Sequence, residues 1–384
     1  MRIAYIYSSL TTVGGADRVI IEKANYFAEQ CGYEVYIITD SQLGLPTAFP
    51  LSPKVNHIDL GMNFFKQYNH SFFIRGYFYL KLMHTYKRKL KDLLNKLRLD
   101  FVITTLGKDA EFLTTLKDGS MKIAESHISK EYLRNLHLLK QRSFPYKIIA
   151  SLWTKRMEKA IKRMDAFIVL TEDDAKKWSN VRKSIVIPNS LPFYPEQSSD
   201  CIGKQIISVG RLYEQKGYDL LIPAWEVVHK QHPDWILSIY GNGEMEKELR
   251  NSICEKKLED SLLIKAPVKN IADKYLESSF YVMSSRFEGF GMTLIEAMAC
   301  GIPCISFKCP NGPADIIKDG EDGLLVENGN IELLAEKINY FIEHEEERKT
   351  MGKRAKENVK RYMPSVIMQK WIELFNSMKE EKQQ

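Results

Sequence analysis

Cysteine is scarce in this chain, and the spacings that would give it a structural role are missing. The 384 residues include six cysteines and no CxxC pair. This usage excludes a disulfide framework and a zinc ribbon, and it is typical of the reduced thiols of a cytoplasmic protein. Cys300, Cys304 and Cys309 lie close together in sequence, but a helix, a turn and a buried strand are predicted there. We therefore expect no metal ligation by them.

Long hydrophobic runs are also missing. No window approaches the roughly 18 uninterrupted apolar residues of a membrane span. The strand-like start MRIAYIY lacks the hydrophobic stretch of a signal peptide. The sequence thus predicts a cytoplasmic protein without a membrane-spanning helix.

The common signatures of nucleotide and metal sites do not occur either. The sequence contains no GxGxxG, GxxxxGKS/T, HExxH or DxD string. Their absence argues against a dinucleotide-dependent dehydrogenase and a P-loop kinase, and it predicts an activity without a resident metal or other cofactor.

What the chain does have is apolar material for two cores. Hydrophobic residues make up 44% of it and charged residues 27%, which is normal for a globular protein. Its length is two to three times that of a usual domain of ~150 residues. Two domains are therefore expected.

Short apolar runs alternate with longer amphipathic stretches along the whole chain. Many runs are apolar at successive positions, as strands covered on both faces require, and repeated β–α–β units give parallel sheets. The fold class is therefore α/β, with two doubly wound, Rossmann-like domains. The predicted strands are 3–7, 35–39, 101–104, 122–124, 166–170, 185–187, 206–209, 236–240, 262–264, 281–283, 304–307 and 324–326.

A linker-like stretch divides the two halves. Residues 188–200 (PNSLPFYPEQSSD) contain three prolines and three serines with little periodicity. We expect an N-terminal domain over 1–190 and a C-terminal domain over 191–364. An amphipathic helix over 365–384 ends the chain, and its own domain or the first one could supply the surface on which it packs.

The net charge of +6 conceals an uneven distribution. Residues 1–190 carry 30 Lys and Arg against 18 Asp and Glu, a net charge of +12. Much of the excess lies in two helix-like stretches with interleaved aromatic residues, 75–98 and 147–163. Such a face can bind nucleic acid, anionic lipid or an anionic ligand, or it can be plain solvated surface.

Ligands of open α/β sheets bind beyond the carboxyl ends of the strands, so the residues that directly follow each strand matter most. After the first strand, Gly14 and Gly15 precede a helix, and they can be an anion-binding turn or an ordinary one. His127 follows the strand at 122–124. It can donate to a bound hydroxyl or carbonyl, shuttle a proton, or be structural.

Two cations follow the strand at 206–209. Arg211 and Lys216 lie in a loop that begins with Gly210 and ends with Gly217. Arg can fork onto two phosphate oxygens while Lys acts as a point charge, so the pair suits a diphosphate.

The most informative segment follows the strand at 281–283. Glu288 lies in the loop, Gly291 opens the backbone, a helix begins near Met292 or Thr293, and Glu296 lies about one turn inside it. Amides at the helix start can hold phosphate, and carboxylates on either side can accept hydrogen bonds from hydroxyls. A nucleotide sugar is a ligand of this kind.

Taken together, these motifs resemble the retaining glycosyltransferases of family 4, which have the GT-B fold of two Rossmann-like domains facing across a cleft. The resemblance covers nearly the whole chain. It depends on GGADRV near the start, His127, VGRL with the following KG, Glu288 and Glu296 with seven residues between them, EAMACGIPCI and DGEDGLLV. The CPNGPADII loop is similar to a subgroup that builds bacterial surface and linked polysaccharides such as lipopolysaccharide. That subgroup often uses UDP-galactose, UDP-N-acetylgalactosamine or UDP-N-acetylglucosamine.

The resemblance implies a role for each candidate residue. The catalytic set would be His127 on the donor sugar, Arg211 and Lys216 on the diphosphate, and Glu288 on the donor sugar. The donor-binding set would be Gly15, Gly210, Phe290, Gly291, Met292, Thr293 and Glu296, with Glu296 on the ribose. One departure is Asp17, where the subgroup usually has Glu. We expect only a shorter carboxylate at the helix start.

The implied function is transfer of a hexose or N-acetylhexosamine from a nucleotide sugar, with UDP expected, to a glycan or lipid-linked acceptor with retention. Peripheral contact with an anionic membrane, at its inner face, is a further expectation, and nucleic acid is not an expected partner. The alternatives are a nucleotide-sugar epimerase or hydrolase of the same fold and a non-catalytic nucleotide-sugar-binding protein. The donor sugar, the acceptor and the oligomeric state stay open.

Overall fold

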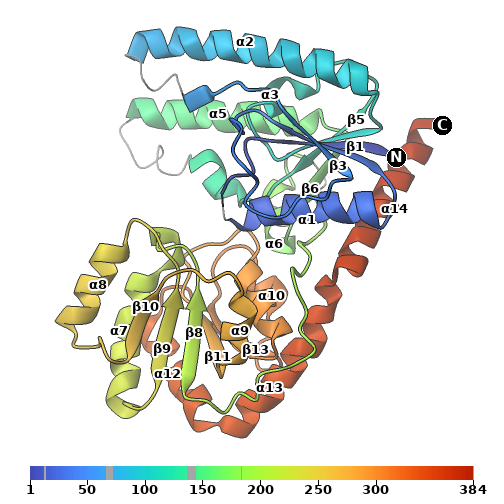
Figure 1. Cartoon of the computed structure of the whole chain (residues 1–384). Coiled ribbons are helices and arrows are strands. Elements are labelled where there is room, and N and C mark those ends of the chain that lie inside the picture. Colours follow the sequence, from blue (N-terminus) through green and yellow to red (C-terminus); the bar gives the residue numbers. More distant parts are fainter. Residues whose placement is uncertain (13, 66–71, 136–143, 183, 384) are drawn as a thin grey trace. The chain divides into compact units, whose positions relative to one another are not determined.

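The computed structural model describes residues 1–12, 14–65, 72–135, 144–182 and 184–383. The chain divides into two compact units. The first unit contains residues 1–170 and 174–187, and the second contains 171–173 and 188–384. Each unit is built on one parallel sheet with helices on both faces (Figure 1). This confirms the predicted pair of doubly wound, Rossmann-like α/β domains.

The sheet of the first unit has the strand order β3-β2-β1-β4-β5-β6-β7, and its pairs are all parallel. The central strands are fully buried along most of their length because helices cover both faces. The strands are β1 (Arg2–Tyr7), β2 (Glu34–Thr39), β3 (Val55–Asp59), β4 (Phe101–Thr104), β5 (Met121–Glu125), β6 (Ala166–Val169) and β7 (Ile185–Val186).

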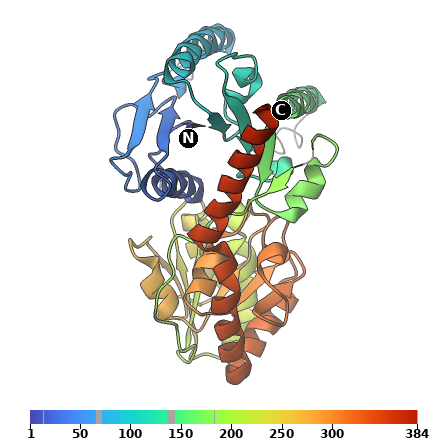
Figure 2. The same ribbon diagram turned by 90° about the vertical axis from the view of Figure 1, so that its right-hand side faces the viewer.

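Helices of the first unit fall on opposite faces of that sheet. One core cluster joins α2 and α5 to the strands through Leu90, Leu94 and Ile161. The helix α1 packs along β2 and β3, and Figure 2 shows it across the sheet from α2. The helices are α1 (Gly15–Glu29), α2 (Phe72–Leu97), α3 (Ala110–Leu113), α5 (Phe144–Lys162) and α6 (Glu172–Trp178), with the 3-10 turn η2 (Lys130–Asn135).

The sheet of the second unit has the order β10-β9-β8-β11-β12-β13, again with parallel pairs. The order reverses direction at β8, so that β8 and β11 are neighbours although β9 and β10 lie between them in the chain. Loops that leave the carboxyl ends of these two strands meet at a topological switch point. The strands are β8 (Gln205–Val209), β9 (Ile236–Tyr240), β10 (Leu262–Lys265), β11 (Phe280–Met283), β12 (Cys304–Phe307) and β13 (Gly323–Val326).

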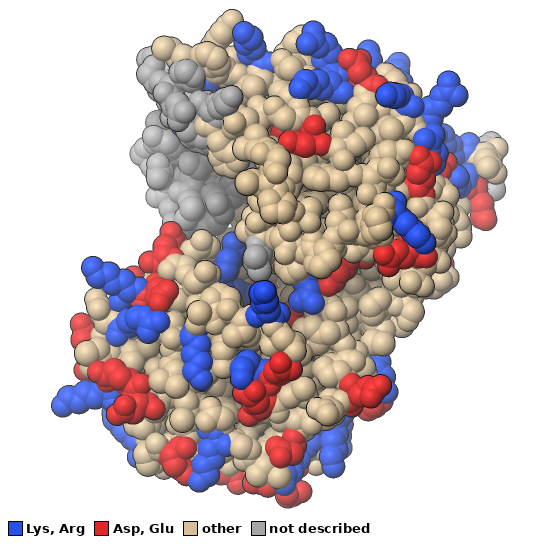
Figure 3. Space-filling view, viewed as in Figure 1, with Lys and Arg blue, Asp and Glu red and all other residues tan. Residues whose placement is uncertain are grey.

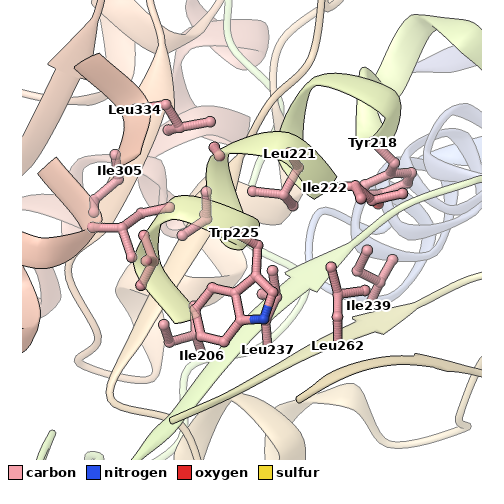
Figure 4. Close-up of a cluster of buried hydrophobic side chains, with 14 of the residues drawn as sticks. Ile206, Tyr218, Leu221, Ile222, Trp225, Leu237, Ile239, Leu262, Ile305 and Leu334 are labelled. Atoms are coloured by element: carbon pink, nitrogen blue, oxygen red, sulfur yellow. The ribbon is translucent and has the colours of Figure 1, made fainter. Parts of the chain in front are cut away.

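One face of the second sheet is sealed by a large apolar cluster around Trp225 of α7 (Figure 4). The indole is fully buried among Ile206 and Leu237, and its Nε1 donates to Ser261 Oγ at 3.2 Å. This rigid base holds the strand ends that carry the candidate residues. The helices are η3 (Glu214–Lys216), α7 (Tyr218–Gln231), α8 (Glu246–Glu255), α9 (Ile271–Leu276), α10 (Met292–Ala299), α11 (Pro313–Ile316), α12 (Ile331–Glu343), α13 (Glu345–Asn358), η4 (Val359–Tyr362) and α14 (Pro364–Gln383).

The structure confirms every predicted strand within one or two residues, but the sequence reasoning missed β3. Only Val55 of this edge strand is buried, and its sequence VNHID is mostly polar, so no apolar run marked it. The terminal helix α14 groups with the second unit. Its packing against the first domain stays a prediction.

Among the described residues, no helix combines the length and the apolar character needed to cross a membrane.

Candidate functional site

Two loops of the second unit, one after β8 and one after β11, are locked together at the carboxyl edge of the sheet. The amide of Arg286 donates to the Gln215 carbonyl at 2.8 Å, and Gln215 Nε2 donates back to the Phe287 carbonyl at 3.0 Å. The Ser284 hydroxyl donates to the Lys216 carbonyl at 3.0 Å. Hydrogen bonds therefore hold the loop that carries Arg211 and Lys216 against the loop that carries Glu288.

Gly217 makes this close approach possible. Its φ is +62°, a left-handed conformation that favours glycine. A Cβ at this position would lie 2.0 Å from the Ser284 carbonyl oxygen. A side chain here would push the two loops apart. This steric requirement explains why glycine stands at position 217.

The locked loops bring Lys216 and Glu288 into contact. Lys216 Nζ lies 2.7 Å from Glu288 Oε1, and the Ser285 hydroxyl donates to the same oxygen at 2.6 Å. The side chains are 16% and 7% exposed, respectively, so the pair is largely shielded from water. A ligand phosphate that recruits Lys216 would have to share it with Glu288. Ser285 was not predicted as a site residue. Its position three residues before Glu288 in the same loop could have indicated that it contacts that carboxylate.

Arg211 and Gly210 lie on the same edge. The Arg211 side chain is exposed, with its guanidinium carbon 5.1 Å from the centre of the Tyr213 ring. Stacking on an aromatic face keeps a guanidinium extended while leaving its N–H groups available. A Cβ on Gly210 would lie 2.8 Å from the Tyr218 hydroxyl and 3.1 Å from Lys216 Cε. Because Gly210 has no side chain, the methylene groups of Lys216 can lie against the backbone at the end of β8.

The start of α10 is shaped by two further glycines. Gly291 precedes the helix with a φ of +102°. Gly312, with a φ of +117°, approaches so closely that a Cβ would lie 1.8 Å from the Phe290 carbonyl oxygen. In the first turn, the Tyr281 hydroxyl lies 2.8 Å from Thr293 Oγ1. Met292 begins the helix, as predicted, so its N-terminal amides lie beside the Glu288 loop.

Glu296 occupies the fifth position of α10 and is 7% exposed. The Tyr275 hydroxyl donates to its Oε2 at 3.3 Å. Burial, reinforced by the Glu296 charge, raises the pKa of Tyr275 well above its usual value, so this phenol stays protonated and can donate. The carboxylate is held in place while keeping acceptor capacity.

In the first unit, Gly15 begins α1 and Asp17 anchors the loop before it. Asp17 accepts hydrogen bonds from the Tyr7 hydroxyl at 2.7 Å and from the Thr12 amide at 3.0 Å, and it is 5% exposed. Burial raises the pKa of Asp17, while these two donors act in the opposite direction. The Asp17 carboxylate therefore links the loop after β1 to its own strand.

His127 follows β5 of the first unit, as predicted, and lies against two charged residues that the sequence reasoning did not assign. Its Nε2 is 3.4 Å from Glu125 Oε1. The same oxygen is bound by Nζ of Lys23, which comes from α1. A lysine on the apolar side of that helix, next to Ala24, was the signal that could have found this cluster.

The structure therefore brings the predicted residues of the second unit onto one sheet edge, and it places Gly15 and His127 in the first unit. Across the described ranges, no three His, Cys, Asp or Glu side chains gather in a way that could hold a metal ion.

Residues 199–358 match the family model described as "Glycosyl transferases group 1". The matched region contains Arg211, Lys216, Glu288 and Glu296. The comparisons support a glycosyltransferase. An uncharacterized glycosyltransferase of Haemophilus influenzae is 28% identical over 377 residues, which cover 96% of this chain and 98% of that protein. The amylovoran biosynthesis glycosyltransferase AmsD of Erwinia amylovora is 36% identical over 219 residues, which cover 54% of this chain and 61% of AmsD.

Among solved structures, a mutant of S. aureus TarM in complex with fondaparinux, α-GlcNAc-glycerol and UDP superposes with a TM-score of 0.79. The match covers 98% of this chain and 99% of TarM at 17% identity. At that identity the likeness concerns the fold, which is GT-B.

Proposed function

We propose that this protein is a retaining glycosyltransferase, similar to family 4, that moves a hexose or N-acetylhexosamine from a UDP-sugar. The acceptor would be a glycan or lipid-linked glycan in surface polysaccharide biosynthesis. The observation that carries the proposal is the Lys216–Glu288 pair beside the start of α10. It sets a cation, a carboxylate and helix-start amides at one strand edge, which is what the phosphate and hydroxyl groups of a nucleotide sugar need.

The donor-binding roles follow from that arrangement. Arg211 and Lys216 would hold the diphosphate, with backbone groups of Gly210, Gly291 and Met292 around it. Phe290 would contribute its backbone, and Thr293 its hydroxyl. Glu288 would hold the donor sugar, and the buried Glu296 would accept from the ribose hydroxyls. The family resemblance implies that Gly15 lies near the phosphates and that His127 contacts the donor sugar.

Two relatives support the proposed substrates. The matched region of AmsD belongs to a protein named for amylovoran biosynthesis, and the TarM structure holds UDP and α-GlcNAc-glycerol. For this chain, the UDP in the TarM structure favours a UDP-sugar over other nucleotide sugars.

The main chemical task would be to stabilise the leaving diphosphate. Breaking the sugar–phosphate bond leaves negative charge on the diphosphate and positive character on the sugar. A preorganised donor in such a site contributes ~3 kcal/mol of transition-state stabilisation. Arg211, Lys216 and the α10 amides would supply these donors without a resident metal. Retention is taken from the family resemblance.

We also propose that α2 contacts an anionic membrane. Its stretch of 72–97 carries seven Lys and Arg and one Asp. Figure 3 displays this basic surface along α2 of the first unit. The exposed apolar side chains Ile74, Tyr77 and Leu80 are 50%, 67% and 68% exposed and accompany the charges. Apolar side chains among cations suit the interface of a bilayer with acidic lipids.

A thermal-shift panel of UDP-, GDP- and ADP-sugars tests the proposed donor class. A ligand at 100 times its dissociation constant adds about 2.7 kcal/mol to the stability of the form that binds it. We expect stabilisation by UDP-galactose, UDP-N-acetylgalactosamine or UDP-N-acetylglucosamine and its loss in Lys216→Met. Lys230→Met, at the exposed far end of α7, is the control that should keep the shift.

The product formed with donor alone separates the alternatives. A transferase needs an acceptor for efficient turnover, whereas an epimerase or hydrolase converts the donor by itself. Stabilisation without turnover against any acceptor would indicate a binding protein. No stabilisation by any UDP-sugar would contradict the proposal.

A further inference from the structure

Two adjacent serines in the loop between β11 and α10 are buried but have different partners. Ser284 is 1% exposed, and its hydroxyl donates to the Lys216 carbonyl at 3.0 Å. Ser285 is 0% exposed, and its hydroxyl donates to Glu288 Oε1 at 2.6 Å. Ser284 therefore helps to hold the two loops of the site together, whereas Ser285 contacts the side chain that the proposed function assigns to the donor sugar.

Two donors approach Glu288 through the same oxygen. Lys216 Nζ lies 2.7 Å from Oε1, which also accepts from Ser285. Neither of these contacts uses Oε2, so that oxygen keeps its capacity to accept a hydrogen bond. The Glu288 amide donates to the Pro310 carbonyl at 3.1 Å, which fixes the backbone that carries the side chain. The direction of the carboxylate therefore depends on the two donors at Oε1.

The two donors differ in how easily they can change partner. Lys216 belongs to the other loop, carries its charge on a flexible four-carbon chain, and is 16% exposed. A diphosphate presents several anionic oxygens, so it competes with Glu288 for this ammonium group. Ser285 is shorter, fully buried and lies in the same loop as Glu288. Its hydroxyl can stay on the carboxylate after Lys216 has turned to a phosphate.

The departure of Lys216 from Glu288 has a cost that Ser285 reduces. The Glu288 side chain is 7% exposed, and a buried carboxylate that loses its cation is strongly disfavoured. At 2.6 Å, the Ser285 bond has the length of a charge-assisted O–H···O⁻ bond, which is roughly twice as strong as a neutral one. Ser285 therefore supplies the stabilising contact that remains.

We propose that Ser285 is a positioning residue that holds the Glu288 carboxylate in place while Lys216 moves from Glu288 to the diphosphate of the nucleotide sugar. Oε1 stays occupied by Ser285, and Oε2 stays available to a hydroxyl of the donor sugar. Before the nucleotide sugar binds, the Lys216–Glu288 pair compensates both charges. The inference rests on the proposed function, because it assigns a nucleotide sugar to this site.

Ser285→Ala separates this role from a merely structural one, because UDP carries the diphosphate but not the sugar. In calorimetric titration, we expect the dissociation constant of UDP to be nearly unchanged in Ser285→Ala. The UDP-sugar that stabilises the wild type in the thermal-shift panel should bind on the order of tenfold more weakly, as when a hydrogen bond to a charged group is lost. Equal weakening of UDP and UDP-sugar, or no weakening of the UDP-sugar, would overturn the proposal.

Ser306 provides a matched control in the neighbouring strand β12. It is also 0% exposed, and its hydroxyl donates to the Phe307 carbonyl at 2.9 Å. Ser306→Ala removes a buried hydroxyl of the same kind without touching Glu288, so the ratio of the UDP and UDP-sugar dissociation constants should stay as in the wild type. A change in that ratio equal to the change in Ser285→Ala would mean that general destabilisation is responsible, which would overturn the proposal.

A double-mutant cycle tests whether Ser285 acts through Glu288. In a Glu288→Ala background, Ser285→Ala should cause no further loss of UDP-sugar affinity. Equal losses in both backgrounds would show that Ser285 does not act through this carboxylate. Failure of UDP and of every UDP-sugar to bind the wild type would contradict the proposed function and this inference with it. UDP binding with an unchanged ratio in Ser285→Ala would contradict the inference alone.

Discussion

Replacing Gly217 by Ala should disrupt the candidate donor site through the backbone alone. The new Cβ would lie 2.0 Å from the Ser284 carbonyl oxygen, whereas real Cβ contacts essentially never fall below 3.0 Å. The loops after β8 and β11 would have to separate by about 1 Å or more. The three hydrogen bonds that lock them together would then be strained or lost.

The size of the effect can be worked out from these contacts. Each lost hydrogen bond costs about 1 kcal/mol, and the left-handed φ of +62° costs an alanine roughly 1–2 kcal/mol. The total is about 4–5 kcal/mol of unfolding free energy. Because Lys216 and Glu288 lie on the two separated loops, affinity for a UDP-sugar should fall as well.

Urea unfolding and calorimetric titration with UDP measure the two effects. Gly329→Ala is the control, since Gly329 has a φ of +82° in the same unit and a Cβ added there would meet nothing within 4 Å. This variant should lose only the roughly 1–2 kcal/mol of the left-handed conformation and keep its affinity. If Gly217→Ala is no less stable than Gly329→Ala and binds UDP equally well, the reasoning about the locked loops is wrong.

Four further predictions concern one or two side chains each. Arg211→Ala should lower kcat by a hundredfold or more if the guanidinium stabilises the leaving diphosphate, and wild-type UDP release would refute that role. Glu296→Ala should mainly weaken donor affinity, so an unchanged dissociation constant would contradict the ribose assignment. The pKa of Glu125 lies at about 2 in the folded chain against an ordinary 4.5. Its ion pair therefore contributes full stability above pH 4.5 and loses it as the pH falls toward 2. In Glu125→Gln, the free energy of urea unfolding should depend less steeply on pH in that window. Tyr77→Ser with Leu80→Ser should reduce co-sedimentation with acidic vesicles while leaving UDP release in solution unchanged, and undiminished co-sedimentation would contradict membrane contact through these two side chains.

Three adjacent basic residues of α2 show why the role of a surface residue cannot be assigned without coordinates. Lys87, Arg88 and Lys89 are adjacent in sequence, but Lys89 Nζ donates to the Leu60 carbonyl at 2.8 Å and Lys87 lies over the Phe112 ring at 5.9 Å. Removing all three would also disturb packing. Tyr77 and Leu80 are more exposed, so their replacement tests membrane contact more cleanly.

The strands were predictable because parallel strands covered on both faces must be apolar at successive positions. The edge strand β3 was not predicted because it has only one neighbouring strand and is mostly exposed, so its side chains do not have to be apolar. The start of α10 at Met292 was predictable from Gly291, since a left-handed residue before a helix favours glycine.

Residues that act through distant contacts were not predictable. Arg211, Lys216 and Glu288 lie in loops that follow strands, and Glu296 lies in the helix that begins after one of these loops. The sheet order places these loops at neighbouring strand ends. Lys23, by contrast, meets Glu125 across 102 positions of sequence. The position of Lys23 next to Ala24 on the apolar side of the helix hints at burial, but its pairing with Glu125 cannot be inferred without coordinates.

The most direct test of the donor site is an experimental structure of the chain with UDP bound. We predict the diphosphate within hydrogen-bond distance of Arg211, Lys216 and the first amides of α10, with the ribose hydroxyls on Glu296. Nucleotide bound at another strand edge, or phosphates that touch neither cation, would contradict the account.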